Sequence, residues 1–474
     1  MKEIDSNCIT SSPLFLTYYF SNKLLLEEEI PFPSKCLQTL LSTQQLISVK
    51  AIIRKGLSIQ CVRCGNKNRK LFSVYPCSRC NQQKHLYCRN CIQMGKISEC
   101  KPLYLWNGTQ AKYTSHANAL TWDGELTYAQ QTASNSLVKA IQGKEKEFLI
   151  WAVCGSGKTE MLFPAINYCM QQGKRIAIAS PRVDVIRELY PRIQSAFEKV
   201  TVEAMYGSSE SKSGMSQIIL ATTHQLMRFR EAFDVIVIDE VDAFPFYYDK
   251  TLTYAANHAK KPHAISIYLT ATPRKDLQNR IRQRKLPHVY VPLRYHGYPL
   301  PEPTMKMSLR LHQSLSNKQF PSIFYKWLSK RNNPKRQLLI FVPTVRLAKD
   351  LQKELCEELL SNRIIKNKSE FQEVYAEDKR REEKINDFRV KKLQVLLTTT
   401  ILERGVTFPS VDVAVMDAGH EVFDEAALVQ IAGRAGRSAT DPTGEVVFFH
   451  SGKTKAMEKS KQLIVDMNRK GKKL

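Results

Sequence analysis

One stretch organises the chain: Phe148-Leu-Ile-Trp-Ala-Val-Cys-Gly-Ser-Gly-Lys-Thr-Glu160, an apolar run of β-type residues that breaks into a loop with two glycines. Such loops cradle phosphate. The glycines let backbone N–H groups turn toward an anion, the lysine reaches the β- and γ-phosphates, and the threonine hydroxyl binds Mg²⁺. The strict pattern has glycine where this chain has Ala152. The residues predicted to hold ATP are Ala152, Val153, Cys154, Gly155, Ser156, Gly157, Lys158 and Thr159.

A second apolar strand ends in acidic residues: Val235-Ile-Val-Ile-Asp-Glu-Val-Asp242. In a parallel sheet such a strand delivers its last residues to the edge where the phosphate loop lies. We expect Asp239 to hold Mg²⁺ and Glu240 to polarise the attacking water. Alone, each motif also occurs by chance, in an ordinary strand-turn-helix unit or at a solvated strand end. Together, in this order, they predict an NTP-hydrolysing enzyme.

The composition indicates a large, basic protein. A length of 474 residues is too great for one hydrophobic core and predicts two or three domains. Apolar content of 43% and charged content of 24% are typical of a soluble globular protein. However, 71 basic against 45 acidic residues leave a formal net charge of +26. That surplus favours a polyanion, with nucleic acid first; the alternatives are a solubility charge or attraction to an anionic membrane face.

The sequence predicts neither a signal peptide nor a membrane-spanning segment. The longest early apolar piece, Pro13–Phe20, is too short to cross a bilayer and follows no basic region. We therefore expect a cytoplasmic protein. In that compartment its twelve cysteines would be reduced thiols or metal ligands rather than disulfides.

Seven of the twelve cysteines lie between residues 61 and 100, and six of them form pairs separated by two residues. This spacing points two thiolates at one ion, and two such pairs complete a tetrahedral zinc site. We expect the first and last pairs to share one zinc ion. The middle pair is either half of a second site, for which Cys100 and His85 are the local candidates, or a pair of spare thiols. The predicted ligands are Cys61, Cys64, Cys77, Cys80, Cys88 and Cys91.

Strands and helices alternate downstream of the phosphate loop and again after a proline-rich segment, residues 292–303. This pattern predicts two α/β domains with parallel sheets, joined by a linker. The second domain lacks a phosphate loop but carries Gly433-Arg-Ala-Gly-Arg437. We expect Arg434 and Arg437 to reach a nucleotide held by the first domain, as arginine fingers do. The alternative for this segment is a basic turn.

Two smaller features complete the prediction. Gln130 follows Thr127 by three residues upstream of the phosphate loop and could read the adenine edge. Leu24–Ile30 has the pattern of a short amphipathic helix. The expected divisions are an N-terminal region (1–55), a zinc-binding cysteine module (56–101), a first sheet domain (102–298), a second sheet domain (299–455) and a basic tail (456–474). We expect the end of that tail, Arg469–Lys473, to be disordered.

The ordered set of motifs resembles a superfamily 2 DExD/H-box helicase motor over residues 120–455. The segments Trp151–Pro164, Asp239–Pro245 and Thr398–Thr407, behind an N-terminal cysteine module, are more narrowly similar to the ComFA family of competence helicases. The resemblance implies two RecA-like domains in tandem that close on Mg·ATP.

The same resemblance implies a motor stimulated by single-stranded DNA, at the cytoplasmic face of the membrane channel for DNA uptake. The implied partners are that channel, a phosphoribosyltransferase-like competence protein and recombination mediators. A replication-restart helicase of the PriA kind is the alternative enzyme, although its cysteines lie within the second half of the motor. An alternative of another class is a zinc-dependent DNA-binding scaffold with weak ATPase activity.

Overall fold

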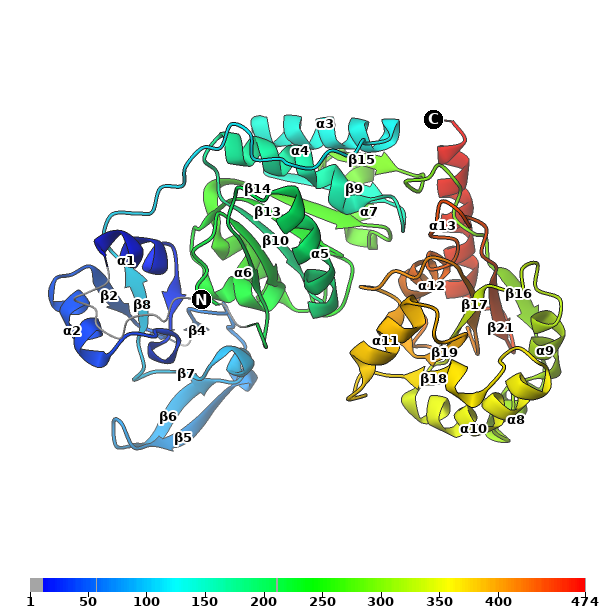
Figure 1. Cartoon of the computed structure of the whole chain (residues 1–474). Helices are drawn as coiled ribbons and strands as arrows, with labels where there is room; N and C mark the ends of the chain where they lie inside the picture. Colours follow the sequence, from blue (N-terminus) through cyan, green and yellow to red (C-terminus); the bar gives the residue numbers. More distant parts are fainter. Residues whose placement is uncertain (1–11, 57, 210–211, 474) are drawn as a thin grey trace.

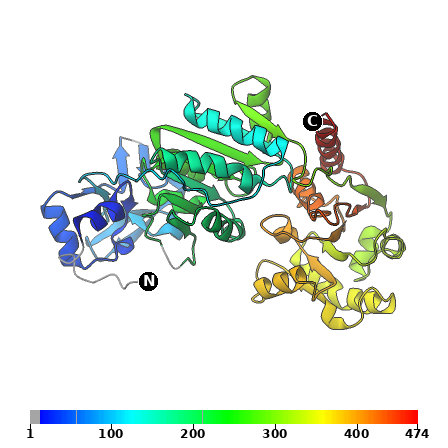
Figure 2. The ribbon, with the colours of Figure 1, turned by 45° about the horizontal axis from the view of Figure 1, so that its top comes forward.

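The structure is a computed structural model and describes residues 12–56, 58–209 and 212–473. Figure 1 shows three parts: an N-terminal part (blue), a first sheet domain (cyan to green) and a second sheet domain (yellow to red). The first sheet domain lies between the other two in both views (Figures 1 and 2). In the described ranges, no helix is long and apolar enough to cross a membrane.

The N-terminal lobe is built on a three-stranded antiparallel sheet with the strand order β1-β8-β2. Its core is aromatic: Phe20 stacks on Trp106 with ring centroids 5.8 Å apart, and Phe32 packs edge-on against Tyr19 at 5.2 Å. The elements are α1 (Pro13–Phe20), β1 (Leu24–Leu25), η1 (Glu27–Glu29), α2 (Ser34–Ser42), β2 (Leu46–Val49) and β8 (Leu103–Trp106).

Three expectations for this region are wrong. The segment Leu24–Ile30 is not one helix, because Leu24 and Leu25 pair with β8 and bury their side chains in the lobe. The boundary at residue 102 is wrong because β8 is the central strand of the N-terminal sheet. The cysteine module is therefore an insertion between β2 and β8. Cys36 is disulfide-bonded, so the expectation that no cysteine forms a disulfide fails there.

The cysteine module consists of a hairpin and a small antiparallel sheet, β5-β6-β7. Arg63, whose side chain is fully buried, donates to both carboxylate oxygens of Glu29 at 2.6 and 2.8 Å and so ties the module to the N-terminal lobe. The elements are β3 (Ile52–Lys55), β4 (Ser58–Cys61), η2 (Arg69–Leu71), β5 (Phe72–Cys77), β6 (Gln82–Cys88), η3 (Ile92–Met94) and β7 (Ile97–Ser98).

The first sheet domain has seven parallel strands in the order β11-β12-β10-β13-β14-β9-β15. Helices α3, α4 and α5 pack on one face of this sheet and α6 and α7 on the other, which explains why the strands are apolar throughout. The strands are β9 (Glu147–Ala152), β10 (Ile176–Ser180), β11 (Val202–Met205), β12 (Ile218–Thr222), β13 (Phe233–Asp239), β14 (Lys260–Thr270) and β15 (His288–Val291). The helices are α3 (Tyr128–Gln142), α4 (Lys158–Gln171), α5 (Val183–Ala196), η4 (Thr223–Arg228), α6 (Lys250–Ala259) and α7 (Lys275–Arg282).

The second sheet domain repeats this plan with six parallel strands in the order β16-β21-β20-β17-β19-β18. The prediction of two parallel-sheet domains in tandem is confirmed. The strands are β16 (Thr304–Met307), β17 (Gln337–Phe341), β18 (Phe371–Val374), β19 (Val395–Thr398), β20 (Val411–Val415) and β21 (Val446–His450). The helices are α8 (Leu311–Ser316), α9 (Ser322–Leu328), α10 (Val345–Ser361), η5 (Lys368–Glu370), α11 (Arg381–Arg389), η6 (Thr400–Leu402), α12 (Glu425–Ala432) and α13 (Lys455–Gly471).

The prediction that the basic end Arg469–Lys473 is disordered is wrong, because helix α13 (Lys455–Gly471) continues into it. Helix α13 occupies residues 455–471 because Met457, Ile464 and Met467 recur at helical spacing and bury one face, while the basic side chains occupy the other. In Figures 1 and 2 the helix (red) stands beside the linker that joins the sheet domains. Near its end, the Lys470 ammonium lies 3.6 Å from the centroid of the Tyr290 ring in the first domain.

Asn468 on α13 allows a test of this packing. Its buried amide accepts from the Leu300 N–H at 2.9 Å and donates to the Leu300 carbonyl at 3.0 Å. Asn468→Ala leaves both buried backbone groups unpaired, and we expect the free energy of unfolding to fall by about 1–3 kcal/mol in urea denaturation. Gln462→Ala, on the exposed side of the same helix, is the matched control. Equal urea midpoints for the two variants would contradict this account.

Candidate nucleotide site between the two sheet domains

The phosphate loop connects β9 to α4 and opens on a cavity of about 540 Å³ between the two sheet domains. Gly155 and Gly157 have positive φ angles of 79° and 73°, which side chains rarely adopt. A Cβ on Gly157 would lie 2.2 Å from Gln130 Nε2, so the loop also needs glycine for space. Ala152 and Val153 are buried at the end of β9, whereas residues 154–159 line the cavity.

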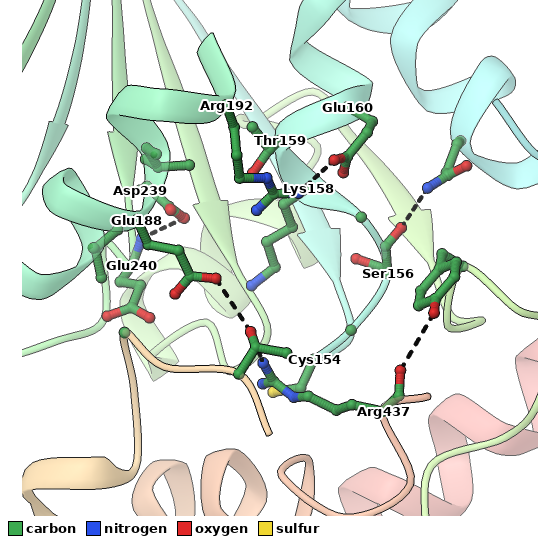
Figure 3. Close-up of a pocket in the computed structure, with 18 of the residues that line it drawn as sticks. Cys154, Ser156, Lys158, Thr159, Glu160, Glu188, Arg192, Asp239, Glu240 and Arg437 are labelled. Carbon is green, nitrogen blue, oxygen red and sulfur yellow. Dashed lines mark hydrogen bonds and ion pairs between the residues drawn. The ribbon is translucent and has the colours of Figure 1, made fainter. Parts of the chain in front are cut away.

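The acidic pair reaches the same cavity from the end of β13 (Figure 3). Burial raises the pKa of Asp239 to about 6, although Lys158 opposes the shift. The Glu240 N–H donates to Asp239 Oδ1 at 2.9 Å and fixes the carboxylate. Burial disfavours the negative charge of this carboxylate. A divalent cation would restore the balance, so the carboxylate is a natural ligand for one.

The residues present fit a bound Mg·ATP. Within the described part of the chain, Ser156 Oγ and Glu240 Oε2 are buried and lack hydrogen-bond partners. Both line the cavity, where a phosphate or a water can satisfy them. Lys158 points into the space between the acidic pair and Arg437 (Figure 3), and the neighbouring Thr159 is buried. The glycine cradle and these polar groups are the donor and acceptor set that a magnesium nucleotide requires.

Arg434 and Arg437 line the cavity from the second domain. Arg434 donates to the Glu403 carbonyl at 3.1 Å, and its burial, together with Arg437, lowers its pKa to about 9. Arg437 donates to the Gly433 carbonyl at 2.9 Å and to Thr407 Oγ1 at 3.1 Å. These partners carry no full charge, so both guanidinium groups can still neutralise a phosphate.

Gln130 lies behind the loop and supports it. Its amide donates to the Ser156 carbonyl at 2.9 Å and accepts from the Thr127 N–H at 2.8 Å, where it closes the cap of α3. The side chain also lines the cavity, where it could contact a bound base. Recognition of adenine by Gln130 stays a prediction. On the opposite side, the Cys154 thiol donates to Gln430 Oε1 of α12 at 3.0 Å, which joins the loop directly to the second domain.

Sequence reasoning missed Arg404 as a site residue. It crosses the interface and donates to Asp242 Oδ2 at 2.6 Å, and both side chains are buried. The hydroxyls of Thr270 and Thr272 donate to the same carboxylate at 2.5 and 2.7 Å. Burial alone would raise the pKa of Asp242, but Arg404 and the two threonines hold it at about 2. The only sequence signal was an arginine inside a motif already singled out, Thr398–Thr407.

Arg294 in the linker was also missed, since nothing distinguishes it among 71 basic residues. It is 2% exposed and donates to the carbonyls of Ala435 at 2.9 Å and of Pro299 and Pro442 at 2.7 Å. Burial and Arg437 lower its pKa to about 10. Its side chain also lies against Gly155. Arg294 therefore connects the linker, the phosphate loop and the loop that carries Arg434 and Arg437.

Seven cysteines and one histidine form two groups of four potential metal ligands. In the first, Cys61 and Cys91 sulfurs lie 3.8 Å apart and Cys64 and Cys88 sulfurs 3.7 Å apart, as expected for the outer pairs. The second group consists of Cys77, Cys80, His85 and Cys100. In each group the ligand atoms lie within 4.8 Å of one another, which suits tetrahedral zinc.

The second group brings the middle pair together with both local candidates. Cys77 and Cys100 sulfurs are 3.6 Å apart, and Cys80 Sγ is 3.4 Å from His85 Nδ1. Backbone N–H groups, first that of Cys80, lower the pKa of the Cys77 thiol to about 6, which favours the thiolate form that a metal binds.

The first cysteine group docks on the first sheet domain. The Tyr254 ring of α6 lies against Gly65, and its hydroxyl donates to the Val62 carbonyl at 3.2 Å. Asn90 donates to Thr251 Oγ1 of the same helix at 2.6 Å. Met94 Sδ accepts from Gln225 Nε2 of η4 at 3.8 Å. The module therefore braces the two elements that follow the ends of β12 and β13.

Comparisons with known proteins agree with this architecture. A family model described as the type III restriction enzyme res subunit matches residues 123–275, and the helicase conserved C-terminal domain matches residues 319–439. In fold alone, the chain is similar to S. cerevisiae Dbp5 bound to RNA and ADP BeF3 (TM-score 0.53, 16% identity, 73% of this chain and 88% of that chain). It is likewise similar to Mycobacterium smegmatis helicase Lhr bound to ssDNA and AMP-PNP (TM-score 0.52, 18% identity, 73% and 50%).

The fold and the site, together with these two family models, define an ATP-hydrolysing enzyme of the superfamily 2 helicase class. More narrowly, the chain belongs to the ComFA family of competence proteins. The ComFA N-terminal domain model matches residues 10–105. Competence protein ComFA of Bacillus subtilis is 40% identical over 94% of this chain and 93% of its own length. The Streptococcus pneumoniae protein of the same name is 35% identical over 83% and 90%.

The Arg404–Asp242 pair yields a test of the interface. Removing one partner of a buried ion pair costs about 3–5 kcal/mol. If the closed interface is the hydrolytic state, we expect Arg404→Ala to lower kcat for ATP by about 10²-fold or more. The control is Arg346→Ala, which removes an exposed arginine of the same domain that pairs only within α10. Turnover near wild type in Arg404→Ala would contradict a catalytic role for the pair.

Proposed function

We propose that the protein moves along single-stranded DNA during natural transformation, driven by ATP hydrolysis. The observation that carries this proposal is a nucleotide cavity with walls from both sheet domains. Because Lys158 and Arg437 belong to different domains, binding and release of nucleotide would alternately close and open the interface. Such closure moves two surfaces relative to one another along a bound strand.

We propose a role in ATP hydrolysis for each charged residue according to where it lies around the cavity. Lys158 would contact the β- and γ-phosphates of ATP, while Thr159 and Asp239 would hold Mg²⁺. Glu240 orients the attacking water and accepts its proton. Arg434 and Arg437 stabilise the charge that develops on the transferred phosphoryl group. Mg²⁺ held there would supply positive charge that offsets the charge of the phosphates.

The proposed path of the single DNA strand lies where loops of both sheet domains meet. Arg182, after β10, donates to the Ile401 carbonyl at 3.2 Å across the interface and lines a groove with Thr400. The net charge of +26 favours binding to phosphates, and unpaired bases can stack on aromatic side chains. By likeness to the competence proteins, we propose that the motor works at the cytoplasmic face of the membrane with the DNA-uptake channel and other competence proteins.

Two alternative functions are disfavoured. A replication-restart helicase of the PriA kind carries its cysteines inside the motor, whereas here residues 61–100 precede the first sheet domain. A DNA-binding scaffold with weak ATPase activity would not need Lys158, the acidic pair and both arginines around one cavity.

We also propose that both cysteine groups hold zinc as structural sites. Four ligands in each group converge, and neither group leaves an open position for a catalytic water. The first group would stiffen the contact with α6 and η4, and the second would close the hairpin of β5 and β6.

Metal content tests this arrangement. We expect two zinc ions per chain in protein purified without chelators, and we expect Cys61→Ser and Cys77→Ser each to lower the content by about one ion. Cys356→Ser removes a free cysteine outside both groups and serves as the control. Zinc content that does not change in Cys77→Ser would restrict the protein to one site.

ATP turnover with and without nucleic acid tests the motor proposal. We expect single-stranded DNA of any sequence to stimulate turnover, with duplex DNA and RNA much weaker. The apparent affinity for single-stranded DNA should fall as the salt concentration rises. A plot of log affinity against log salt concentration should have a slope of about −0.7 for each neutralised phosphate. Lys158→Ala should abolish turnover, and Arg437→Ala should lower it by about 10³-fold or more. Turnover that ignores all nucleic acids would favour the scaffold; stimulation by RNA equal to that by DNA would contradict the DNA substrate.

A further inference from the structure

The loop directly after Asp242 exposes aromatic rings. Its sequence is Ala243-Phe-Pro-Phe-Tyr-Tyr-Asp249. Phe244 is 71% exposed and Tyr248 is 74% exposed, although both side chains are large and apolar. Single exposed apolar residues are common, but two such rings within five residues, of which Phe244 lines a groove, indicate a binding surface.

The loop is held in place rather than free. Phe246 is buried and anchors it to the first sheet domain. The Arg274 guanidinium lies over the Tyr247 ring at 3.7 Å, and Tyr247 supports Tyr248 edge-on with ring centroids 5.2 Å apart. Arg274 also pairs with Asp424, the N-cap residue of α12, at 3.2 Å, so the second domain contributes to the same arrangement. The exposed rings are therefore presented on a supported platform.

Phe244 forms part of a groove of about 490 Å³ between the two sheet domains, where Arg182 and Arg381 also lie. Each arginine pairs with a carboxylate of the opposite domain, Arg182 with Glu403 and Arg381 with Asp184. Both pairs stay partly exposed to solvent, so a phosphate can compete for these guanidinium groups. The groove thus offers cations for a backbone next to an apolar ring.

We propose that Phe244 and Tyr248 stack on unpaired bases of a single DNA strand that runs through this groove. The inference rests on the proposed function and names the residues that would meet the bases. A single strand is the occupant that this chemistry fits, because a duplex hides the faces of its bases in its own stack. Each stacked base accounts for about tenfold or more in affinity when the ring is removed.

The same loop connects the strand to ATP hydrolysis. Only Val241, Asp242 and Ala243 separate Glu240 from Phe244, and the Ala243 N–H donates to the Glu240 carbonyl at 2.8 Å. Asp242 itself is held by Arg404 of the second domain. A base that shifts Phe244 would therefore act on the residue that orients the attacking water, which explains how a strand stimulates turnover.

The test compares oligo(dT) with an abasic oligonucleotide of the same length, which has the phosphates but no bases. For full-length wild type, we expect half-maximal stimulation of ATP turnover at a concentration of oligo(dT) about tenfold or more below that of the abasic strand. In Phe244→Ala/Tyr248→Ala this difference should disappear. Phe244→Tyr/Tyr248→Phe should restore it, because the rings remain.

Leu309→Ala is the matched control, because it removes an 82% exposed apolar side chain outside the groove and should keep the wild-type difference. Unfolding temperatures of all variants check that the loop change is local. A double alanine variant that still prefers oligo(dT) to the abasic strand would overturn the inference, and the rings would then belong to a protein contact. A wild type that no single strand stimulates would refute the proposed function itself.

Discussion

The buried ion pair between Asp242 and Arg404 is the constraint on which the interface depends. Removing either charge from water is costly, and that cost is offset only when the two domains meet and the pair forms. Thr270 and Thr272 supply the remaining hydrogen bonds to the carboxylate, so the end of β14 is tied to the same point. A buried charge that loses its partner is unfavourable. The interface therefore favours an arrangement in which the pair is fully formed or one in which both groups are in water.

Around this pair, three sites meet in a short stretch of chain. Asp239 and Glu240 face the nucleotide cavity, Asp242 faces the second domain, and Phe244 faces the groove. The six residues Asp239–Phe244 therefore include the acidic pair of the nucleotide cavity, the contact between the domains and the inferred contact with a base.

The parts outside the motor act as supports. The cysteine module, inserted into the N-terminal lobe, rests on α6 and η4 through Tyr254 and Met94. These elements follow the strands whose ends face the second domain. At the other side, Arg294 and α13 hold the linker against both sheet domains.

The sequence by itself determined the phosphate loop, the acidic pair, Arg434, Arg437 and the paired cysteines, because backbone geometry imposes their spacing within a few residues. Two parallel-sheet domains followed from the alternation of strands and helices. Only the tertiary structure decided the roles of Arg404 and Arg294 and the pairing of β8 with the N-terminal strands. It also turned the basic tail into α13. These features depend on burial and on partners far away in the chain, and local spacing carries no record of what a side chain will be buried against.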